Sequence, residues 1–277
     1  MDDRGPDSRG KRWLRALVSD TSEILAPLKS LLVCDAVLFD EPVRYIAVVP
    51  NPENRFARAR NGEVGLDEAW TLAKVVREIA AADEGQKKRA IIAIVDVNGQ
   101  AYGRREESLG LFLGCAAAVA AYATARLSGH PVVSLIVGHA FSGGFLAHGY
   151  QANRILAVEA PEVVVHAMGK SATARVTRRD HDELDKYAGD IIPMACDIQA
   201  YAKLGTLHKL IRGVCGDSPT PGDVQRVLNE LKSAIVHARA GSLDLSHRLD
   251  NPEALESRKA SLEVRRRLTE QWNSLPD

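Results

Sequence analysis

Two hydrophobic periods alternate along this chain, and they predict alternating helices and strands. The apolar residues of 66–82 recur at helical spacing and place one apolar face on a predicted amphipathic helix. The runs 90–95 and 131–137 are almost continuously apolar, which is typical of strands buried on both faces of a parallel sheet. A long helix is expected between them, from about residue 108 to 128. Strands that alternate with helices predict an α/β fold with a mostly parallel sheet.

The remaining pattern predicts a helical N-terminal segment, further strands and a largely helical C-terminal part. Residues 1–10 are polar and are expected to be disordered, and 11–277 are expected to form a single domain. Residues 13–33 show helix-like spacing that Pro27 interrupts. Strands are expected at 43–49, 154–158 and 163–166, and helices at 182–188, 194–204, 223–239 and 253–272. The helical C-terminal region begins at about residue 217.

The composition mainly excludes classes of protein. The chain has 277 residues, of which 45% are hydrophobic and 26% charged, as in an ordinary soluble α/β protein. Lys plus Arg and Asp plus Glu balance at 36 each, so no global field favours nucleic acid or an anionic membrane. The alanine-rich segment 109–125 is too weakly hydrophobic for a membrane span, and the charged N-terminus lacks an apolar signal core. The four cysteines include no C-x-x-C pair, which favours reduced thiols in the cytoplasm.

The most informative segment follows the apolar run 131–137. It contains Ser142, Gly143 and Gly144, and we expect a small-residue turn there, followed by a helix that begins near Phe145. Such a junction leaves backbone N–H groups unpaired, and glycines let a ligand approach them without a side-chain clash. The chemistry that suits this geometry is the stabilisation of a developing oxyanion. The alternative is a plain tight turn between a strand and a helix.

A second glycine-bearing loop follows the strand at 90–95. It runs from Asp96 through Gly99, Gln100 and Tyr102 to Ser108. Because the carboxyl ends of parallel strands meet at one edge of a sheet, this loop and the first junction are expected to lie together. Each would then supply one amide to a carbonyl oxygen. The alternative is a long surface loop that ends in an acidic first turn of the next helix.

Other catalytic chemistries find less support in the sequence. A G-x-S-x-G nucleophile elbow has glycine two residues before the serine, but Ala140 occupies that position relative to Ser142. Nothing in the spacing places His139, His148 or His166 beside Ser142 as a base. The separation of His139 and His148 matches no metal-ligand spacing on one helix, and we predict no metal site. A hydrogen-bonded structural role is the simpler interpretation of such a histidine.

Three segments in order resemble one known family. The loop 96–107, the junction 142–149 and the stretch 165–170 together resemble the gamma subunit of malonate decarboxylase, which is similar to one half of acyl-CoA carboxyltransferases in the crotonase-like superfamily. The resemblance covers roughly residues 40–215. The chain departs from the family at Asn98, where members often have proline, and at Gly144, where some have alanine.

The resemblance implies a crotonase-like spiral of ββα units with additional C-terminal helices. It implies a heteromer with a beta subunit, and decarboxylation of a malonyl thioester on an acyl carrier protein to the acetyl thioester and CO2. The chain would bind no cofactor, because the substrate is carried on a phosphoribosyl-dephospho-CoA prosthetic group of the carrier. The alternatives are a carboxyltransferase subunit that moves the carboxyl group to biotin, and a non-catalytic scaffold half. A free-standing serine hydrolase that uses Ser142 is a further alternative.

The resemblance also assigns roles to particular residues. Gly143 and Gly144 are the first candidates for the oxyanion amides, followed by Gly99 and Gln100. No side-chain nucleophile is needed, because loss of CO2 leaves an enolate whose charge builds on the thioester oxygen. The candidates for positioning the substrate are Ser142, Tyr102 and His166.

Overall fold

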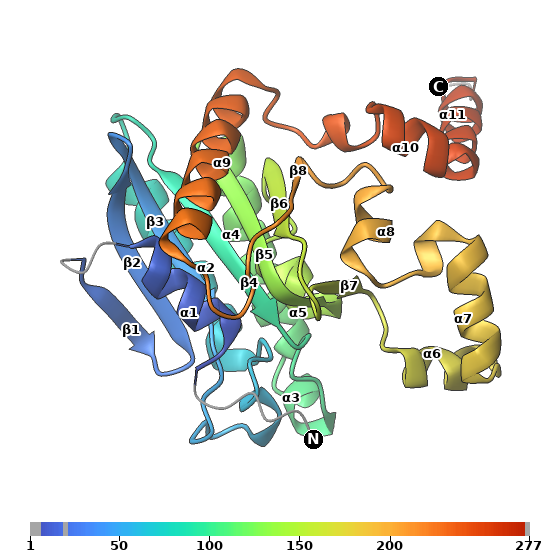
Figure 1. Cartoon of the computed structure of the whole chain (residues 1–277), viewed down its shortest axis with the longest axis horizontal. Helices are drawn as coiled ribbons and strands as arrows, with labels where there is room; N and C mark the ends of the chain where they lie inside the picture. Colours follow the sequence, from blue (N-terminus) through green and yellow to red (C-terminus); the bar gives the residue numbers. More distant parts are fainter. Residues whose placement is uncertain (1–6, 19–21, 275–277) are drawn as a thin grey trace.

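The computed structural model describes residues 7–18 and 22–274, and these form a mixed α/β structure around one eight-stranded sheet (Figure 1). The strands follow the order β1-β2-β3-β4-β5-β6-β8, and β7 pairs with the end of β5. The strands are β1 Ile24–Leu28, β2 Leu31–Leu38, β3 Glu41–Val48, β4 Ala90–Val97, β5 Val132–Phe141, β6 Arg154–Val158, β7 Val164–His166 and β8 Lys209–Ile211.

The sheet is antiparallel at one side and parallel across the rest. The pairs β1–β2 and β2–β3 are antiparallel, and the pairs β3–β4, β4–β5, β5–β6 and β6–β8 are parallel. The ten-residue strand β5 is shared, because its first half pairs with β6 and its last three residues pair with β7. The predicted mostly parallel α/β fold is confirmed.

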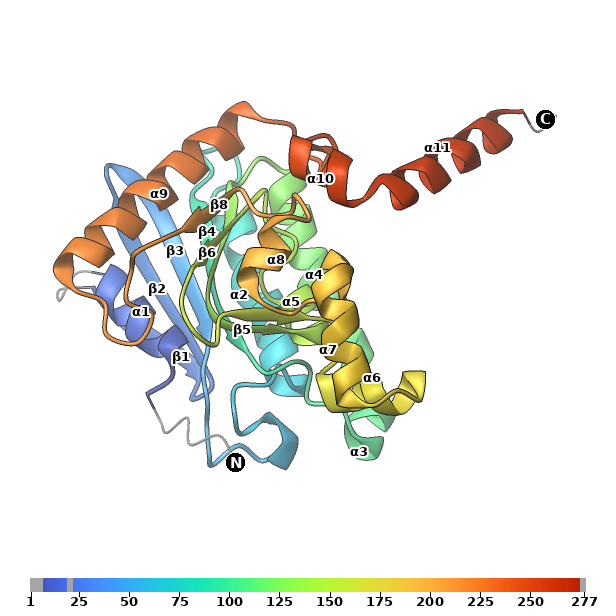
Figure 2. The same ribbon diagram turned by 45° about the vertical axis from the view of Figure 1, so that its right-hand side comes forward.

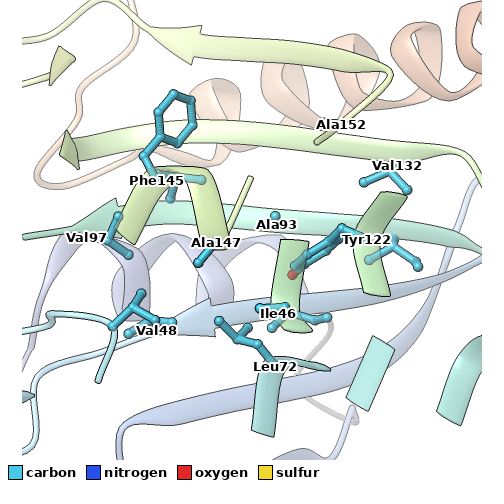
Figure 3. Close-up of a cluster of buried hydrophobic side chains, with 14 of the residues drawn as sticks. Ile46, Val48, Leu72, Ala93, Val97, Tyr122, Val132, Phe145, Ala147 and Ala152 are labelled. Atoms are coloured by element: carbon cyan, nitrogen blue, oxygen red, sulfur yellow. The ribbon is translucent and has the colours of Figure 1, made fainter. Parts of the chain in front are cut away.

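Helices cover both faces of the sheet. Helices α2 (Leu66–Ala82) and α4 (Leu111–Leu127) pack on one face, and α1 (Arg9–Leu17) and α9 (Pro221–Ala240) on the other (Figure 1). Side chains of the strands alternate between the two resulting hydrophobic clusters, as period-two geometry requires. Figure 3 shows the α2/α4 cluster, in which Phe145 and Ala147 of α5 (Ser142–Ala147) lie next to Val97 of β4. The end of β4 thereby packs against α5.

The N-terminal predictions need correction. Helix α1 already begins at Arg9, so the predicted disorder over 1–10 is wrong for residues 9 and 10, and residues 1–6 lie outside the described part. Ser8 caps this helix, and the buried Arg9 pairs with Asp217. The predicted helical stretch 13–33 ends at Leu17, and the antiparallel hairpin β1–β2 takes its place beyond residue 23. Pro27 has no backbone N–H to donate, and its absence is tolerated because β1 is an edge strand.

The C-terminal part is helical as predicted, but it is more divided. The expected helix 194–204 is only a 3-10 turn, Ile192–Met194, followed by α8 (Ile198–Ala202). The expected helix 253–272 is split at Arg258 into α10 (Pro252–Ser257) and α11 (Lys259–Asn273). The three-residue strand β8 was not predicted. The other helices and 3-10 turns are α3 Arg104–Ser108, α6 Lys170–Thr177, α7 His181–Asp190, η1 Ala57–Ala59 and η3 Ser246–Arg248.

Two exclusions from the sequence have structural counterparts. The four cysteines are free thiols, as predicted. Within the described ranges, no helix combines the length and apolar character that crossing a membrane requires.

Candidate active site

The two glycine junctions follow neighbouring parallel strands. Strand β4 ends at Val97, and β5 ends at Phe141, where α5 begins directly. Val97 lies opposite Ala140 in the ladder, so both chains leave the sheet at the same edge. The expected meeting of the two junctions follows from this register.

Direct contacts join the junctions. The Gly143 N–H donates a hydrogen bond to Gln100 Oε1, with a nitrogen–oxygen distance of 2.8 Å. A Cβ atom at Gly144 would lie only 2.3 Å from the Gly99 carbonyl oxygen, so α5 approaches the loop more closely than any side chain there permits. An alanine at position 144 would require the 98–103 loop to shift. The structure therefore brings together Gly99, Gln100, Gly143 and Gly144.

The first junction is not the turn that the sequence predicts. Helix α5 begins at Ser142 and not at Phe145, so its first three residues are Ser142, Gly143 and Gly144. The change of direction is concentrated at Ser142, whose φ of 51° is unusual for a residue with a side chain. Because they begin a helix, the N–H groups of these residues have no intrahelical acceptor.

The second junction is held by backbone hydrogen bonds. Gly99 has a φ of 91°, which lets the chain reverse after β4. Its carbonyl oxygen accepts from the Val64 N–H at 2.9 Å, and the Ala101 N–H returns a bond to the Val64 carbonyl at 2.9 Å. The backbone on either side of Gln100 is thus fixed, while its side chain reaches across to α5.

The substrate-positioning candidates are placed differently from one another. Strand β7 brings His166 beside Phe141, and the two rings stack with centroids 3.7 Å apart. Burial lowers the pKa of His166, so the imidazole is held neutral at the β5 exit. Tyr102 follows Gln100, but its side chain is 62% exposed. His166 and Ser142 therefore adjoin the glycine junctions, and the Tyr102 side chain points to solvent.

Asp96 and Asn98 of the second junction support the site through hydrogen bonds that the sequence did not predict. The buried Asp96 at the end of β4 accepts the backbone N–H groups of Gly10 and His139, both at 3.1 Å. Asn98 binds His139 Nδ1 through its side-chain oxygen at 2.8 Å and donates to the Asn61 carbonyl at 2.6 Å. Where family members often have a proline that restricts the backbone, Asn98 holds the loop through side-chain hydrogen bonds. A polar residue at the end of a wholly apolar strand was the available signal for Asp96.

His148 as a catalytic base and a metal centre gain no support from the geometry of the described residues. His148 is fully buried, and its ring bonds the Tyr122 hydroxyl at 3.0 Å and the Ile94 carbonyl at 3.0 Å. Burial lowers its pKa to about 4, so it is the neutral structural histidine that the simpler interpretation predicts. Among the described residues, no three His, Cys, Asp or Glu side chains form a group suited to a metal ion.

A mixed sheet with glycine-bearing junctions at the ends of two adjacent parallel strands is typical of the crotonase-like fold of the carboxyltransferase type. The beta subunit of geranyl-CoA carboxylase from Pseudomonas aeruginosa shares this fold, with a TM-score of 0.56 and 16% identity over 88% of this chain and 44% of that one. A family model described as malonate decarboxylase gamma subunit matches residues 59–272. The chain belongs to the malonate decarboxylase gamma subunit family.

Solved structures of the same family are much more similar. In a Pseudomonas malonate decarboxylase hetero-tetramer in complex with coenzyme A, one chain is 49% identical, with a TM-score of 0.88 over 95% of this chain and 99% of that chain. In a Pseudomonas MdcD–MdcE hetero-dimer the identity is 50% and the TM-score 0.86, over 96% of this chain and all of that chain.

A curated relative carries a related activity in its name. The malonyl-S-ACP:biotin-protein carboxyltransferase of Malonomonas rubra is 32% identical over 191 residues. The match covers 68% of this chain and 65% of the length of that relative.

Proposed function

We propose that this chain is the gamma-type half of a decarboxylase that acts on a malonyl thioester. The bond between the terminal carboxylate and the central carbon breaks, CO2 leaves, and the electron pair passes to an enolate whose charge develops on the thioester oxygen. Backbone N–H groups aimed at that oxygen stabilise the transition state, and protonation of the carbon then gives the acetyl thioester. The family match over residues 59–272 supports this assignment.

One hydrogen bond identifies the candidate donor to the oxyanion. The Gln100 side-chain oxygen accepts the Gly143 N–H at 2.8 Å. A carboxamide oxygen and a thioester oxygen are both sp² acceptors, so Gln100 Oε1 marks the position that a substrate oxygen would take after the Gln100 side chain moves aside. The Gly143 amide is our first candidate for the oxyanion donor.

The remaining candidates take supporting roles in this proposal. Gly144 supplies a neighbouring amide and permits the close approach of α5 to Gly99. Gly99 keeps the loop in its left-handed conformation, so that Gln100 faces α5. Ser142 and the neutral His166 flank the same edge and would contact the substrate. Tyr102, which is exposed, would contact either the substrate or a partner.

We further propose the partners and the setting of the reaction. A beta subunit would complete the site, as the named Pseudomonas MdcD–MdcE hetero-dimer suggests. The substrate would arrive on the phosphoribosyl-dephospho-CoA group of an acyl carrier protein, and this chain would bind no cofactor of its own. We propose a cytoplasmic complex.

Reconstitution tests the proposed function. The chain alone is expected to release no CO2 from a malonyl thioester, because half of the site is missing. The chain with a malonate decarboxylase beta subunit is expected to release one CO2 for each acetyl thioester formed, as measured by gas release and mass spectrometry. Activity that depends on a biotinylated acceptor protein would identify the carboxyltransferase instead. Full activity with this chain omitted would identify a non-catalytic half.

Helix α11 offers a surface for the partner. It extends away from the rest of the molecule, and no residue in it is buried (Figure 2). Val264, Leu268 and Trp272 recur every four residues and are 56%, 59% and 77% exposed. This spacing places them on one face of the helix. An apolar stripe on a projecting helix is typical of a surface that another subunit covers.

We expect Leu268→Asp to weaken association with the beta subunit at least tenfold. The substitution removes roughly 1.5–3 kcal/mol of apolar burial and puts a charge into the contact, and about 1.4 kcal/mol corresponds to a factor of ten. The measurement is co-purification, followed by a dissociation constant from light scattering. The melting temperature of the isolated chain should change little, because Leu268 is exposed there.

Asn273→Asp provides the matched control, because it adds the same acid to the opposite side of the same helix. Equal loss of association in both variants would mean that net charge, and not the apolar stripe, governs assembly.

A further inference from the structure

The exposed side of helix α4 is apolar along its whole length. Between Glu107 and Arg126 the chain contains no charged residue, and α4 begins at Leu111 within this stretch. The exposed residues of α4 recur mainly at intervals of three and four, so they lie on one side of the helix. We call this side the α4 face, and its residues are Phe112, Leu113, Ala116, Ala120, Thr124 and Leu127. The Thr124 hydroxyl is the single polar side-chain group among these six.

Helix α2, which packs beside α4 on the same side of the sheet, does not share this pattern. Its exposed residues include Lys74, Arg77 and Glu78. A surface helix ordinarily turns a polar side to water, and a helix that is apolar all round is ordinarily buried. Phe112 and Leu127, near the two ends of α4, are nevertheless 60% and 57% exposed. The pattern therefore indicates a surface that another molecule covers.

Two further exposed apolar side chains extend this surface near the N-terminal end of α4. The Trp70 ring of α2 lies against Gly114, where an added Cβ atom would be 3.3 Å from Trp70 Nε1. Leu109 lies two residues before α4, and its side chain is also exposed. The apolar surface is thus broadest at the N-terminal end of the helix.

That end of α4 lies beside both glycine junctions. Leu111, the first residue of α4, shares a buried cluster with Ala101 of the 98–103 loop, and Ala101 directly follows Gln100. Helix α5, which contains Gly143, packs on α4. A molecule that covers the α4 face is therefore placed next to the loop and the helix that form the candidate site.

We propose that the α4 face is the docking surface for the beta subunit that completes the candidate active site. This inference rests on the proposed function, in which this chain supplies only one half of the site. A partner that completes the site has to reach the two glycine junctions, and a partner seated on the α4 face does so. The face offers apolar area and the small side chains of Ala116 and Ala120, but no charge. The matching surface of the beta subunit is therefore apolar and packs closely over the two alanines.

Two other occupants match the α4 face less well. A second copy of this chain, docked through the same face by two-fold symmetry, would join two identical halves and exclude the different half that the reaction needs. Helices that bind a lipid surface carry lysine and arginine on their polar side. The stretch between Glu107 and Arg126 has no such cation, and the buried Arg126 guanidinium donates to the Gln151 and Leu243 carbonyls.

Binding of the full chain to a malonate decarboxylase beta subunit tests the proposal. Ala120→Arg puts a charge in the middle of the α4 face, and Phe112→Arg puts one near its N-terminal end. Each is expected to raise the dissociation constant by at least about tenfold, because the charge loses its hydration in an apolar contact. Val236→Arg is the matched control, because Val236 is 55% exposed on α9, which covers the other side of the sheet. The control should bind as the parent does in a calorimetric titration.

Activity separates docking from chemistry. Ala120 lies about 12 Å along the helix from Phe112, on the side away from the start of α4. Ala120→Arg should therefore raise the beta-subunit concentration needed for half-maximal CO2 release and leave the maximal rate unchanged. Val236→Arg should reach the same maximal rate at the concentration that the parent requires.

Hydroxyl-radical footprinting of the parent chain keeps the proposal testable if the arginine variants do not fold. Oxidation of Phe112, Leu113 and Leu127 should be largely lost when the beta subunit is bound. Unchanged oxidation in the complex would overturn the docking surface, as would equal dissociation constants for Ala120→Arg, Phe112→Arg and the control. Protection of the α4 face by a second copy of the chain, or by anionic phospholipid vesicles in place of the beta subunit, would overturn the choice of partner.

The same measurements distinguish this inference from the proposed function. A complex that releases CO2 but leaves the α4 face open to oxidation would overturn the docking surface alone. A complex that protects the α4 face but releases no CO2 from a malonyl thioester would overturn the proposed function alone. A parent chain that does not bind the beta subunit would overturn both.

Discussion

Replacing Asp96 with alanine is expected to lower the melting temperature of the chain by roughly 10 °C. The carboxylate accepts the Gly10 and His139 N–H groups, of which the first bond is buried and the second is part-buried. Loss of the acceptor leaves two donors unsatisfied, at about 1–3 kcal/mol each. For a chain of this size, each kcal/mol corresponds to about 2–4 °C. Scanning calorimetry of the isolated chain measures the effect.

Two variants separate the hydrogen bonds from other consequences of the change. Asp96→Asn keeps the shape and one acceptor oxygen, so its melting temperature should lie between those of the parent and Asp96→Ala. Asp180→Ala removes an exposed cap, whose side chain accepts the Glu183 N–H at 2.8 Å, and should cost only about 1 kcal/mol. An Asp96→Ala variant no less stable than Asp180→Ala would refute the anchoring role of Asp96.

The spacing of hydrophobic residues predicted the central part of this fold well. There, the residues that each helix or strand buries follow directly from the period of that element. The helix predicted over 66–82 is α2, and the strand predicted over 90–95 is β4, with every residue buried. The hairpin at 24–38 was missed because its leucines also fit helical spacing. An edge hairpin takes its structure from the neighbouring strand β3, which local sequence does not reveal.

The part of the candidate site that depends on strand order alone was predictable from the sequence. Two glycine-bearing exits from adjacent parallel strands meet at one edge, and the contacts between Gln100 and Gly143 agree with that rule. The side-chain bond itself depends on the length of Gln100 and on the left-handed residues Gly99 and Ser142. Asp96 and strand β8 depend on pairings between residues far apart in the chain, which a single sequence does not specify.

Removing the Gly143 amide is expected to reduce kcat/KM of the reconstituted decarboxylase by about 10²–10³. Gly143→Pro deletes the N–H group that now bonds Gln100 Oε1, while proline is tolerated in the first turn of a helix. If this amide stabilises the enolate oxygen, its loss raises the barrier by the amount typical of one oxyanion donor. Stopped-flow measurement of CO2 release from the malonyl thioester gives the rate.

Gly143→Ala is the matched control, because it keeps the N–H and adds a side chain of similar bulk. Its Cβ would lie 2.9 Å from Gln100 Oε1, the end of a flexible side chain that is free to rotate away. We therefore expect its activity to stay within about tenfold of the parent, well short of the loss expected for a missing donor. Proline also restricts Ser142, whose φ is already 51°, so both variants must show the same melting temperature and the same assembly. Equal rates for the alanine and proline variants under those conditions would remove Gly143 from the reaction and leave its amide as a structural tie to Gln100.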